Sequence, residues 1–299
     1  MKTKILSIVV FALIVLPNFA VAQEINLLQM PPEVEASSYV VMDAKSGQVL
    51  LEKNSNTQLI AASLTKVITA LVVLDAKAPF DKQVAITKSD QTLGLCGRGG
   101  ACIKAKAGVK FTVNDLFHAA MMPSANNATT ALARSTGLST KQFVAKMNAK
   151  AKTLGATRSK FYEPAGLNAG NVVTAADYAK IMVAAFENPY LREIAQKQTF
   201  ELTPTNNNKY NQTIKNTDKL LKDGDFTMLG AKTGYLKSRY NFAGVLKYQG
   251  GVELSIVILR APHLYTAFAD TKELASYAQS QLVVAEKPDP ALTASLIRQ

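Results

Sequence analysis

Histidine and cysteine are scarce in this chain of 299 residues, which contains two of each. A structural zinc site usually takes four such ligands at short spacings. His118 and His263 are far apart in the sequence, and neither shows a ligand-like spacing. The sequence therefore predicts no metal site, and we interpret both histidines as structural or incidental.

No apolar run reaches the roughly 20 residues that a helix needs to span a bilayer. The run Ile5–Leu16 has 12 residues, follows two lysines and precedes the small-residue stretch Ala20–Ala22. This pattern predicts a secretory signal peptide over residues 1–22, with an uncleaved anchor as the alternative. No cysteine stands directly after the predicted cleavage site, so nothing indicates a lipoprotein. We expect an exported protein, periplasmic or otherwise extracytoplasmic, that is soluble or associated with the cell wall.

Acidic residues are also few, with 22 Asp and Glu against 34 Lys and Arg, which gives a net charge of +12. Solubility alone would account for most of these lysines. The excess also favours attraction to an anionic polymer outside the cytoplasm, such as a cell wall. No basic run is interleaved with aromatic residues, so we expect no nucleic-acid partner.

Strand patterns lie near both ends of the chain, and helical patterns lie between them. We predict strands over 38–42, 48–53, 226–231, 241–248 and 252–259 and helices over 59–74, 113–122, 128–134, 140–154, 175–186 and 265–284. Ser139 and Thr174 are candidate N-caps. The pattern predicts an α+β fold: an antiparallel sheet built from the N- and C-terminal segments and flanked by helices. A helical subdomain is inserted over roughly 75–215, the domain covers 23–286, and a tail covers 287–299.

The two cysteines, Cys96 and Cys102, bracket a glycine-rich stretch. In an oxidising compartment this spacing suits a disulfide that closes a short loop. We expect the bond to stiffen the rim of a site.

Three short polar motifs interrupt the predicted core elements. Ser63 and Lys66 are three residues apart on an apolar helix, so their side chains share one face. Burial lowers the pKa of a lysine, and a neutral amine beside a hydroxyl is a general base beside a nucleophile. Ser124 and Asn126 follow at a break between helix and loop. Lys232, Thr233 and Gly234 follow a strand and precede Tyr235.

In this order, Ser-x-x-Lys, Ser-x-Asn and Lys-Thr-Gly are typical of penicillin-interacting serine enzymes. From roughly Ser38 to Gln281 the chain resembles the low-molecular-mass penicillin-binding proteins, the serine D-alanyl-D-alanine carboxypeptidases and endopeptidases. The segments 39–47, 163–167, 174–177 and 216–221 extend this likeness to the peptidase branch. The resemblance implies a β-lactamase/transpeptidase-like fold, cell-wall remodelling, and peptidoglycan peptides and β-lactams as ligands. It implies no cofactor, and we expect a monomer.

The resemblance also implies a role for each motif residue. Ser63 forms an acyl-enzyme, Lys66 takes its proton, and Ser124 relays a proton to the leaving amine. The substrate-binding residues are Asn126 for the peptide backbone, Lys232 for the local positive field, Thr233 for the acceptor side, and Gly234 with Tyr235. The backbone N–H groups of Ser63 and Tyr235 form the oxyanion hole.

Two departures from the family pattern bear on the substrate. Ala267 stands where the carboxypeptidases have an arginine that helps to recognise a free carboxylate. Arg260, Lys237 or Arg239 are possible substitutes. The stretch after residue 290 has few large apolar residues, so we expect no stable membrane anchor. Both features favour cleavage of cross-links at least as much as trimming of terminal D-alanine.

Two other functions compete with this interpretation. A class A-like β-lactamase needs a glutamate that activates the deacylating water, and Glu163 lies in a near match to that pattern, one residue too long. A non-catalytic wall-binding or antibiotic-sensing domain is the second alternative. Such sensors usually carry a membrane signalling segment, and all catalytic positions here hold competent residues.

Overall fold

The computed structural model describes residues 30–248 and 250–285. Contacts divide the chain into residues 1–31 and the unit Pro32–Gln299, which contains the sheet and the helices. The predicted signal peptide and the tail from 287 onward lie outside the described residues. Both remain predictions.

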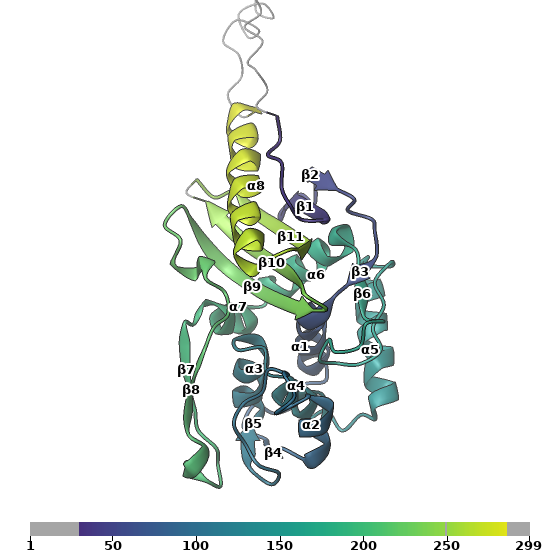
Figure 1. The fold of residues 1–299 in the computed structure, drawn as a ribbon, viewed down its shortest axis with the longest axis vertical. Coiled ribbons are helices and arrows are strands. Elements are labelled where there is room, and N and C mark those ends of the chain that lie inside the picture. Colours follow the sequence, from purple (N-terminus) through teal and green to yellow (C-terminus); the bar gives the residue numbers. More distant parts are fainter. Residues whose placement is uncertain (1–29, 249, 286–299) are drawn as a thin grey trace, which may run out of the picture. The chain divides into compact units, whose positions relative to one another are not determined.

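A five-stranded sheet of order β2-β1-β11-β10-β9 forms the frame of the fold, with its neighbouring strands antiparallel (Figure 1). Its strands are β1 (Ser38–Asp43), β2 (Val49–Lys53), β9 (Phe226–Leu236), β10 (Arg239–Tyr248) and β11 (Glu253–Ala261). The two N-terminal strands thus join three C-terminal strands, as the sequence predicts. Strand β9 lies at the edge of this sheet, so half of its backbone N–H groups point away from β10.

Most helices come from the middle of the chain. They are α1 (Thr65–Asp75), α2 (Lys88–Leu93), α3 (Val113–Met121), α4 (Asn126–Arg134), α5 (Thr140–Thr153), α6 (Ala175–Glu187) and α7 (Pro189–Gln196). The last helix, α8 (Leu264–Ala285), packs on β10 and β11, while α6 packs on β1, β10 and β11. The predicted α+β fold class is confirmed.

Two hydrophobic clusters cover the two faces of the sheet. One contains Val40, Val257 and the buried faces of α1, α3, α4 and α6. The other contains Val41, Ile256 and the apolar side of α8. Neighbouring strand residues such as Val40 and Val41 enter different clusters because successive side chains of a strand point to opposite faces. Burial on both faces fixes the register of the strands that carry the site.

Short paired strands complete the architecture. They are β3 (Leu59–Ile60) with β6 (Val172–Val173), β4 (Gln83–Ala85) with β5 (Lys110–Thr112), and β7 (Thr199–Leu202) with β8 (Gln212–Lys215). Short 3₁₀ turns lie at η1 (Ala62–Leu64), η2 (Asn208–Tyr210) and η3 (Leu220–Lys222). No helix in the described part of the chain combines the length and hydropathy needed to cross a membrane.

Candidate active site

The nucleophile motif begins just before helix α1, although the sequence predicts that it lies inside a longer helix. Leu59 and Ile60 pair with β6, Ala62 has a φ of 50°, and Ser63 lies in the turn η1 before α1 starts at Thr65. The prediction of one continuous helix over 59–74 is therefore wrong at its N-terminal end. A positive φ at a residue with a Cβ is strained, which indicates that surrounding contacts impose the turn.

Gly166 supplies one of these contacts. A Cβ atom on Gly166 would lie 1.9 Å from the carbonyl oxygen of Ala62, and the residue has a φ of 86°. Only glycine permits this close approach of two backbone segments. The loop that follows Glu163 therefore holds the Ala62 turn, and with it the backbone of Ser63.

Lys66 is completely buried, and its amine lies 2.9 Å from the hydroxyl oxygen of Ser63. The same amine donates to Oδ1 of Asn126 at 2.8 Å and to the carbonyl oxygen of Ala165 at 2.6 Å. Burial, together with the positive charge of Lys232, lowers the pKa of Lys66 well below its ordinary value. A neutral amine has two N–H groups for the two carbonyl oxygens and one lone pair for the hydroxyl of Ser63.

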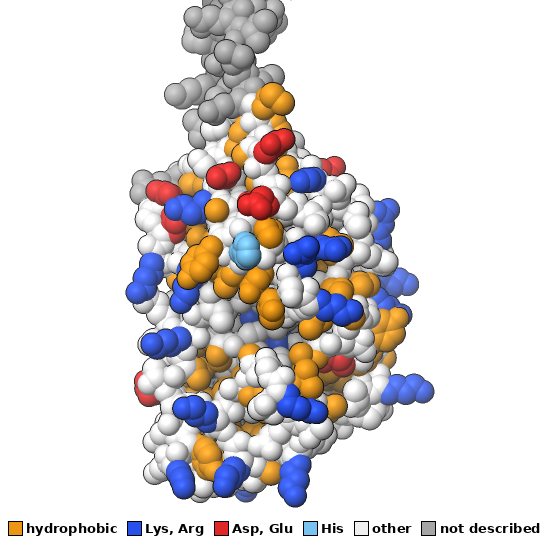
Figure 2. Space-filling view, in the orientation of Figure 1, with side chains coloured by type: hydrophobic (Ala, Val, Ile, Leu, Met, Phe, Trp, Pro, Cys, Tyr) orange, Lys and Arg blue, Asp and Glu red, His pale blue; other side chains and the backbone are white. Residues whose placement is uncertain are grey.

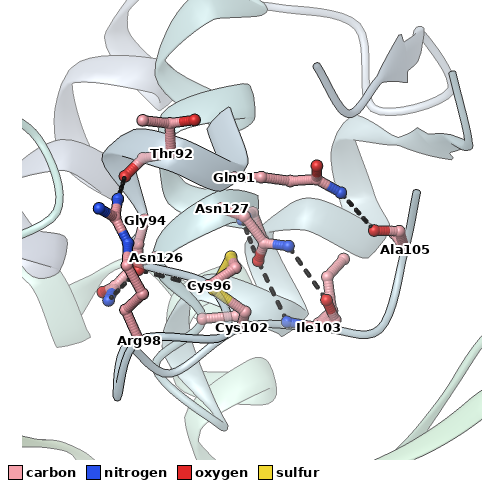
Figure 3. Close-up of a disulfide and its surroundings, with 12 residues drawn as sticks. Gln91, Thr92, Gly94, Cys96, Arg98, Cys102, Ile103, Ala105, Asn126 and Asn127 are labelled. Atoms are coloured by element: carbon pink, nitrogen blue, oxygen red, sulfur yellow. Dashed lines mark hydrogen bonds between the residues drawn. A yellow bond between two sulfur atoms is a disulfide. The ribbon is translucent and has the colours of Figure 1, made fainter. Parts of the chain in front are cut away.

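Asn126 is the first residue of α4, and its side chain is fixed from both ends. Its amide nitrogen donates to the carbonyl oxygen of Gly94 at 3.1 Å, which leaves Oδ1 for Lys66. Its backbone nitrogen donates to the carbonyl oxygen of Ala101 at 2.6 Å. The segment between α2 and β5 therefore orients the amide of the second motif (Figure 3).

The predicted disulfide between Cys96 and Cys102 is present, with 5.7 Å between the Cα atoms. It closes the loop that contacts Asn126, and the neighbouring Asn127 bonds both the N–H and the carbonyl of Ile103 (Figure 3). The bond thus stiffens the segment that positions the second motif.

Ser124 lies between α3 and α4 with a φ of 64°. Its hydroxyl oxygen is buried and has no hydrogen-bond partner within the described part of the chain. An unpaired buried hydroxyl is costly unless a ligand or water completes it.

The third motif lies within β9, whereas the sequence predicts that it follows a strand. Lys232, Thr233 and Gly234 pair with Ala243, Phe242 and Asn241 of β10, and Tyr235 continues the strand. Residue 234 is close to the nucleophile turn, because a Cβ there would lie 3.2 Å from the carbonyl oxygen of Ala61. The ring of Tyr235 is exposed and lies 4.6 Å from the ring of Tyr240.

Lys232 is buried, and its amine donates to the carbonyl oxygen of Thr233 at 3.1 Å. Burial lowers the pKa of Lys232 to about 7, although the negative charge of Asp218 opposes this shift. Burial likewise raises the pKa of Asp218 to about 6. The hydroxyls of Thr217 and Thr233 are 2.8 Å apart.

The motifs therefore meet from four parts of the chain. Lys66 contacts both Ser63 and Asn126, and Thr233 contacts Thr217. The motif reasoning assigned no role to Ala165, Thr217 or Asp218. The family resemblance of segments 163–167 and 216–221, which contain all three residues, is the indication that the sequence offers.

The contacts of Glu163 differ from those expected of the glutamate that activates the deacylating water in class A β-lactamases. Its carboxylate accepts the backbone N–H groups of Ala165, Gly166, Leu167 and Asn168 and the side-chain amide of Asn171. These contacts occupy both oxygens in folding the loop. Glu163 therefore holds the Ala165 carbonyl against Lys66, and the β-lactamase alternative is not favoured.

Comparison with known proteins agrees with this geometry. Residues 26–263 match the family model of D-alanyl-D-alanine carboxypeptidases, peptidase family S11. The chain belongs to this family, so the predicted recognition and the predicted enzyme class, a serine hydrolase, are confirmed.

Curated relatives include both branches of the family. The chain is 27% identical to a D-alanyl-D-alanine endopeptidase of Escherichia coli, over 90% of this chain and 84% of the relative. It is 32% identical to the corresponding endopeptidase of Haemophilus influenzae, over 80% and 75% of the two chains. Relatives named carboxypeptidases include DacB2 of Mycobacterium tuberculosis, 34% identical over 76% of each chain.

Solved structures show the same fold. The Streptomyces K15 DD-transpeptidase is 26% identical, with a TM-score of 0.77 over 83% of this chain and 98% of that chain. A D-alanyl-D-alanine carboxypeptidase of Mycobacterium tuberculosis is 29% identical, with a TM-score of 0.74 over 83% and 92%.

Proposed function

We propose that the chain hydrolyses D,D-peptide bonds in peptidoglycan stem peptides through an acyl-enzyme on Ser63. The observation that carries this proposal is the 2.9 Å contact between Ser63 and the fully buried amine of Lys66. Two carbonyl acceptors occupy the N–H groups of a neutral Lys66. Its lone pair is left for the hydroxyl proton of the nucleophile.

In this proposal the Oγ atom of Ser63 attacks the scissile carbonyl carbon while Lys66 takes its proton. The N–H groups of Ser63 and Tyr235 stabilise the oxyanion, each contributing a few kcal/mol. The C–N bond then breaks as Ser124 passes a proton to the leaving amine. Water attacks the ester, the C–O bond breaks, and Ser63 regains its proton. No cofactor takes part in any step.

The remaining motif residues bind substrate in this proposal. Asn126 bonds the peptide backbone, Lys232 keeps the cleft positive, and Thr233 contacts the acceptor side beside the edge strand. An extended peptide can add to such an edge through main-chain hydrogen bonds. β-Lactams would acylate the same serine. Extracytoplasmic location and a monomeric state belong to this proposal as well.

Labelling with benzylpenicillin tests the nucleophile. We expect mass spectrometry of a protease digest to find the penicilloyl adduct on the peptide that contains Ser63. The Ser63→Ala variant should remain unlabelled while keeping the thermal stability of the parent protein. An adduct on another residue, or full labelling of Ser63→Ala, would contradict the mechanism.

A further inference from the structure

Three cationic side chains surround a small pocket beside the nucleophile turn. The pocket has a volume of about 170 Å³ and is lined by Lys237, Arg239 and Arg260. The rest of its lining is apolar or neutral and consists of Leu59, Ile60, Ala62, Leu236 and Asn241. Ala62 connects the pocket directly to the backbone of Ser63.

No acidic residue lines this pocket, which we call the cationic pocket. Among the described residues, none of its three cations forms a salt bridge. In the view of Figure 2, basic side chains outnumber acidic ones, and the acidic ones gather mainly in the upper part of the picture. Three like charges around one concavity repel one another, and an anion bound among them would relieve that repulsion.

The walls of the pocket are fixed by backbone contacts. The amide of Asn241 donates to the carbonyl oxygens of Ile60 and Ala61 and accepts the backbone N–H of Arg260. These bonds occupy the polar groups of the Asn241 side chain. The side chains of Lys237, Arg239 and Arg260 therefore remain to bind a ligand. Lys237 lies in the two-residue turn between β9 and β10, where both residues have positive φ values. This turn type suits the twist of a hairpin and holds Lys237 in place.

The parts of the site follow one another along strand β9. Thr233, which contacts Thr217, comes first, then Gly234 beside the nucleophile turn, and then Leu236 and Lys237 at the cationic pocket. From Thr233 to Lys237 an extended strand covers about 13 Å. The leaving amine lies at the Thr233 end in the proposed mechanism. A substrate lying along β9 therefore directs its acyl-donor part toward the cationic pocket.

We propose that the cationic pocket binds a carboxylate on the acyl-donor part of the stem peptide. This inference rests on the proposed function, because it takes the direction of the substrate from it. The terminal carboxylate of a leaving D-alanine lies on the opposite side of the scissile bond. The pocket thus discriminates between donor peptides. It does not affect the preference for a free or a cross-linked acceptor.

Paired substrates test the proposal. Two D,D-peptides would be compared that differ only in whether the donor carboxylate is free or amidated. We expect the parent protein to favour the free carboxylate by about tenfold in kcat/KM, as for a charge-assisted contact. The double variant Lys237→Asn, Arg260→Asn should lose that preference. Asparagine tolerates the positive φ of both positions, so the backbone is retained. The control Lys141→Gln, Lys146→Gln removes two exposed charges from α5 and should keep the preference.

Three results would overturn the inference. In the first, the double variant keeps the kcat/KM preference for the free carboxylate. In the second, kcat/KM of the double variant falls equally on both substrates. In the third, the peptide preference is unaltered and only the binding of the variant to purified cell walls is weakened. Benzylpenicillin acylation of the parent protein is measured in parallel. Absence of a Ser63 adduct would reject the proposed function itself, whereas normal acylation with no carboxylate preference would reject the cationic pocket alone.

Discussion

Lys66 is the residue on which the proposed chemistry depends, because its protonation state decides whether Ser63 is activated. A buried lysine with two carbonyl acceptors and one hydroxyl neighbour is suited to the neutral form. The positive charge of Lys232 favours that form further. Sequence spacing predicts the pair, but the carbonyl of Ala165 is contributed by a loop 99 residues away. No local pattern could have revealed that contact.

The variant Lys66→Arg separates a base from a fixed charge. Arginine keeps the positive charge but does not lose its proton in proteins. We expect the rate of Ser63 acylation by benzylpenicillin to fall by a factor on the order of 10² or more, as for loss of a general base. Circular dichroism and thermal melting would serve as folding controls. Acylation within a few-fold of the parent rate would refute the role as a base.

Asp218 is a buried carboxylate that faces the third motif. Its Oδ1 atom accepts the N–H of Leu220, and Oδ2 has no partner within the described residues. Its negative charge raises the pKa of Lys232 and so opposes the effect of burial. Without that charge, Lys232 would lose its proton at a lower pH.

The variant Asp218→Asn should therefore shift the alkaline limb of the pH profile. If acylation needs Lys66 neutral and Lys232 charged, the acid limb reports Lys66 and the alkaline limb reports Lys232. With the pKa of Lys232 at about 7 in the parent protein, we expect that limb to move to lower pH in the variant, because the charge of Asp218 raises this pKa. Asp223→Asn, which alters a carboxylate paired with Lys272, is the matched control. Superimposable profiles for all three proteins would disprove the assignment.

At the scale of elements, the sequence predicts best where capping residues mark helix ends. Ser139 and Thr174 cap α5 and α6 through hydrogen bonds to Gln142 and Asp177, as predicted. Helix α8 begins and ends within one residue of its prediction. These helices have strong local patterns, so tertiary contacts reinforce what the sequence already favours.

Some elements that the prediction omitted also carry local markers. Thr87 and Asp90 form a capping box for α2, and Asn188 followed by Pro189 begins α7. Both patterns are local and visible in the sequence, so they could have predicted these helices. The turn at Ser63 is different, because its contacts with Gly166 and with β6 come from distant segments. Tertiary structure there overrides a helical pattern.

The disulfide loop is an element whose removal should affect both stability and catalysis. A loop closed over so few residues constrains little of the unfolded chain, so we expect Cys96→Ser with Cys102→Ser to cost about 2 kcal/mol or less. Acylation should slow by a few-fold, on the order of 1 kcal/mol or less, because Ala101 of the loop and the adjacent Gly94 accept the backbone and side-chain N–H groups of Asn126. Thermal melting and acylation rates measure the two effects. Unchanged acylation alongside a lower Tm would show that the bond does not position Asn126.

At the scale of the molecule, the candidate site lies where the sheet meets the helical layer. Strand β9 contributes the third motif, and η1, which carries Ser63, packs against it. Lys66 enters from α1, which follows η1 directly. The sequence predicts the fold class because strand and helix patterns are segregated along the chain. These patterns alone do not predict that Lys232 and Lys66 become close enough to influence each other, because that depends on packing between layers. Only the family resemblance implies a positive field from Lys232 at the site.

Substrate preference belongs to this largest scale, because it depends on how the whole cleft receives an acceptor. Ala267 is completely buried within the cluster beneath α8, so it offers no group to a terminal carboxylate. In the proposed mechanism, Thr233 contacts the acceptor side and Lys232 keeps the cleft positive. Loss of a bidentate guanidinium weakens selection for a free carboxylate. We therefore propose that cross-links are cleaved at least as well as terminal D-alanine.

Comparing kcat/KM on a purified D,D-cross-linked dimer and on a monomeric pentapeptide tests this preference. We expect the dimer to be cleaved at an equal or higher rate, because an acceptor without a terminal carboxylate loses no specific contact in this cleft. Benzylpenicillin acylation of the same preparation serves as the activity control. A strong preference for the pentapeptide, on the order of tenfold or about 1.4 kcal/mol, would reject the endopeptidase assignment. It would leave the Ser63 mechanism intact and would indicate that another cation compensates for Ala267.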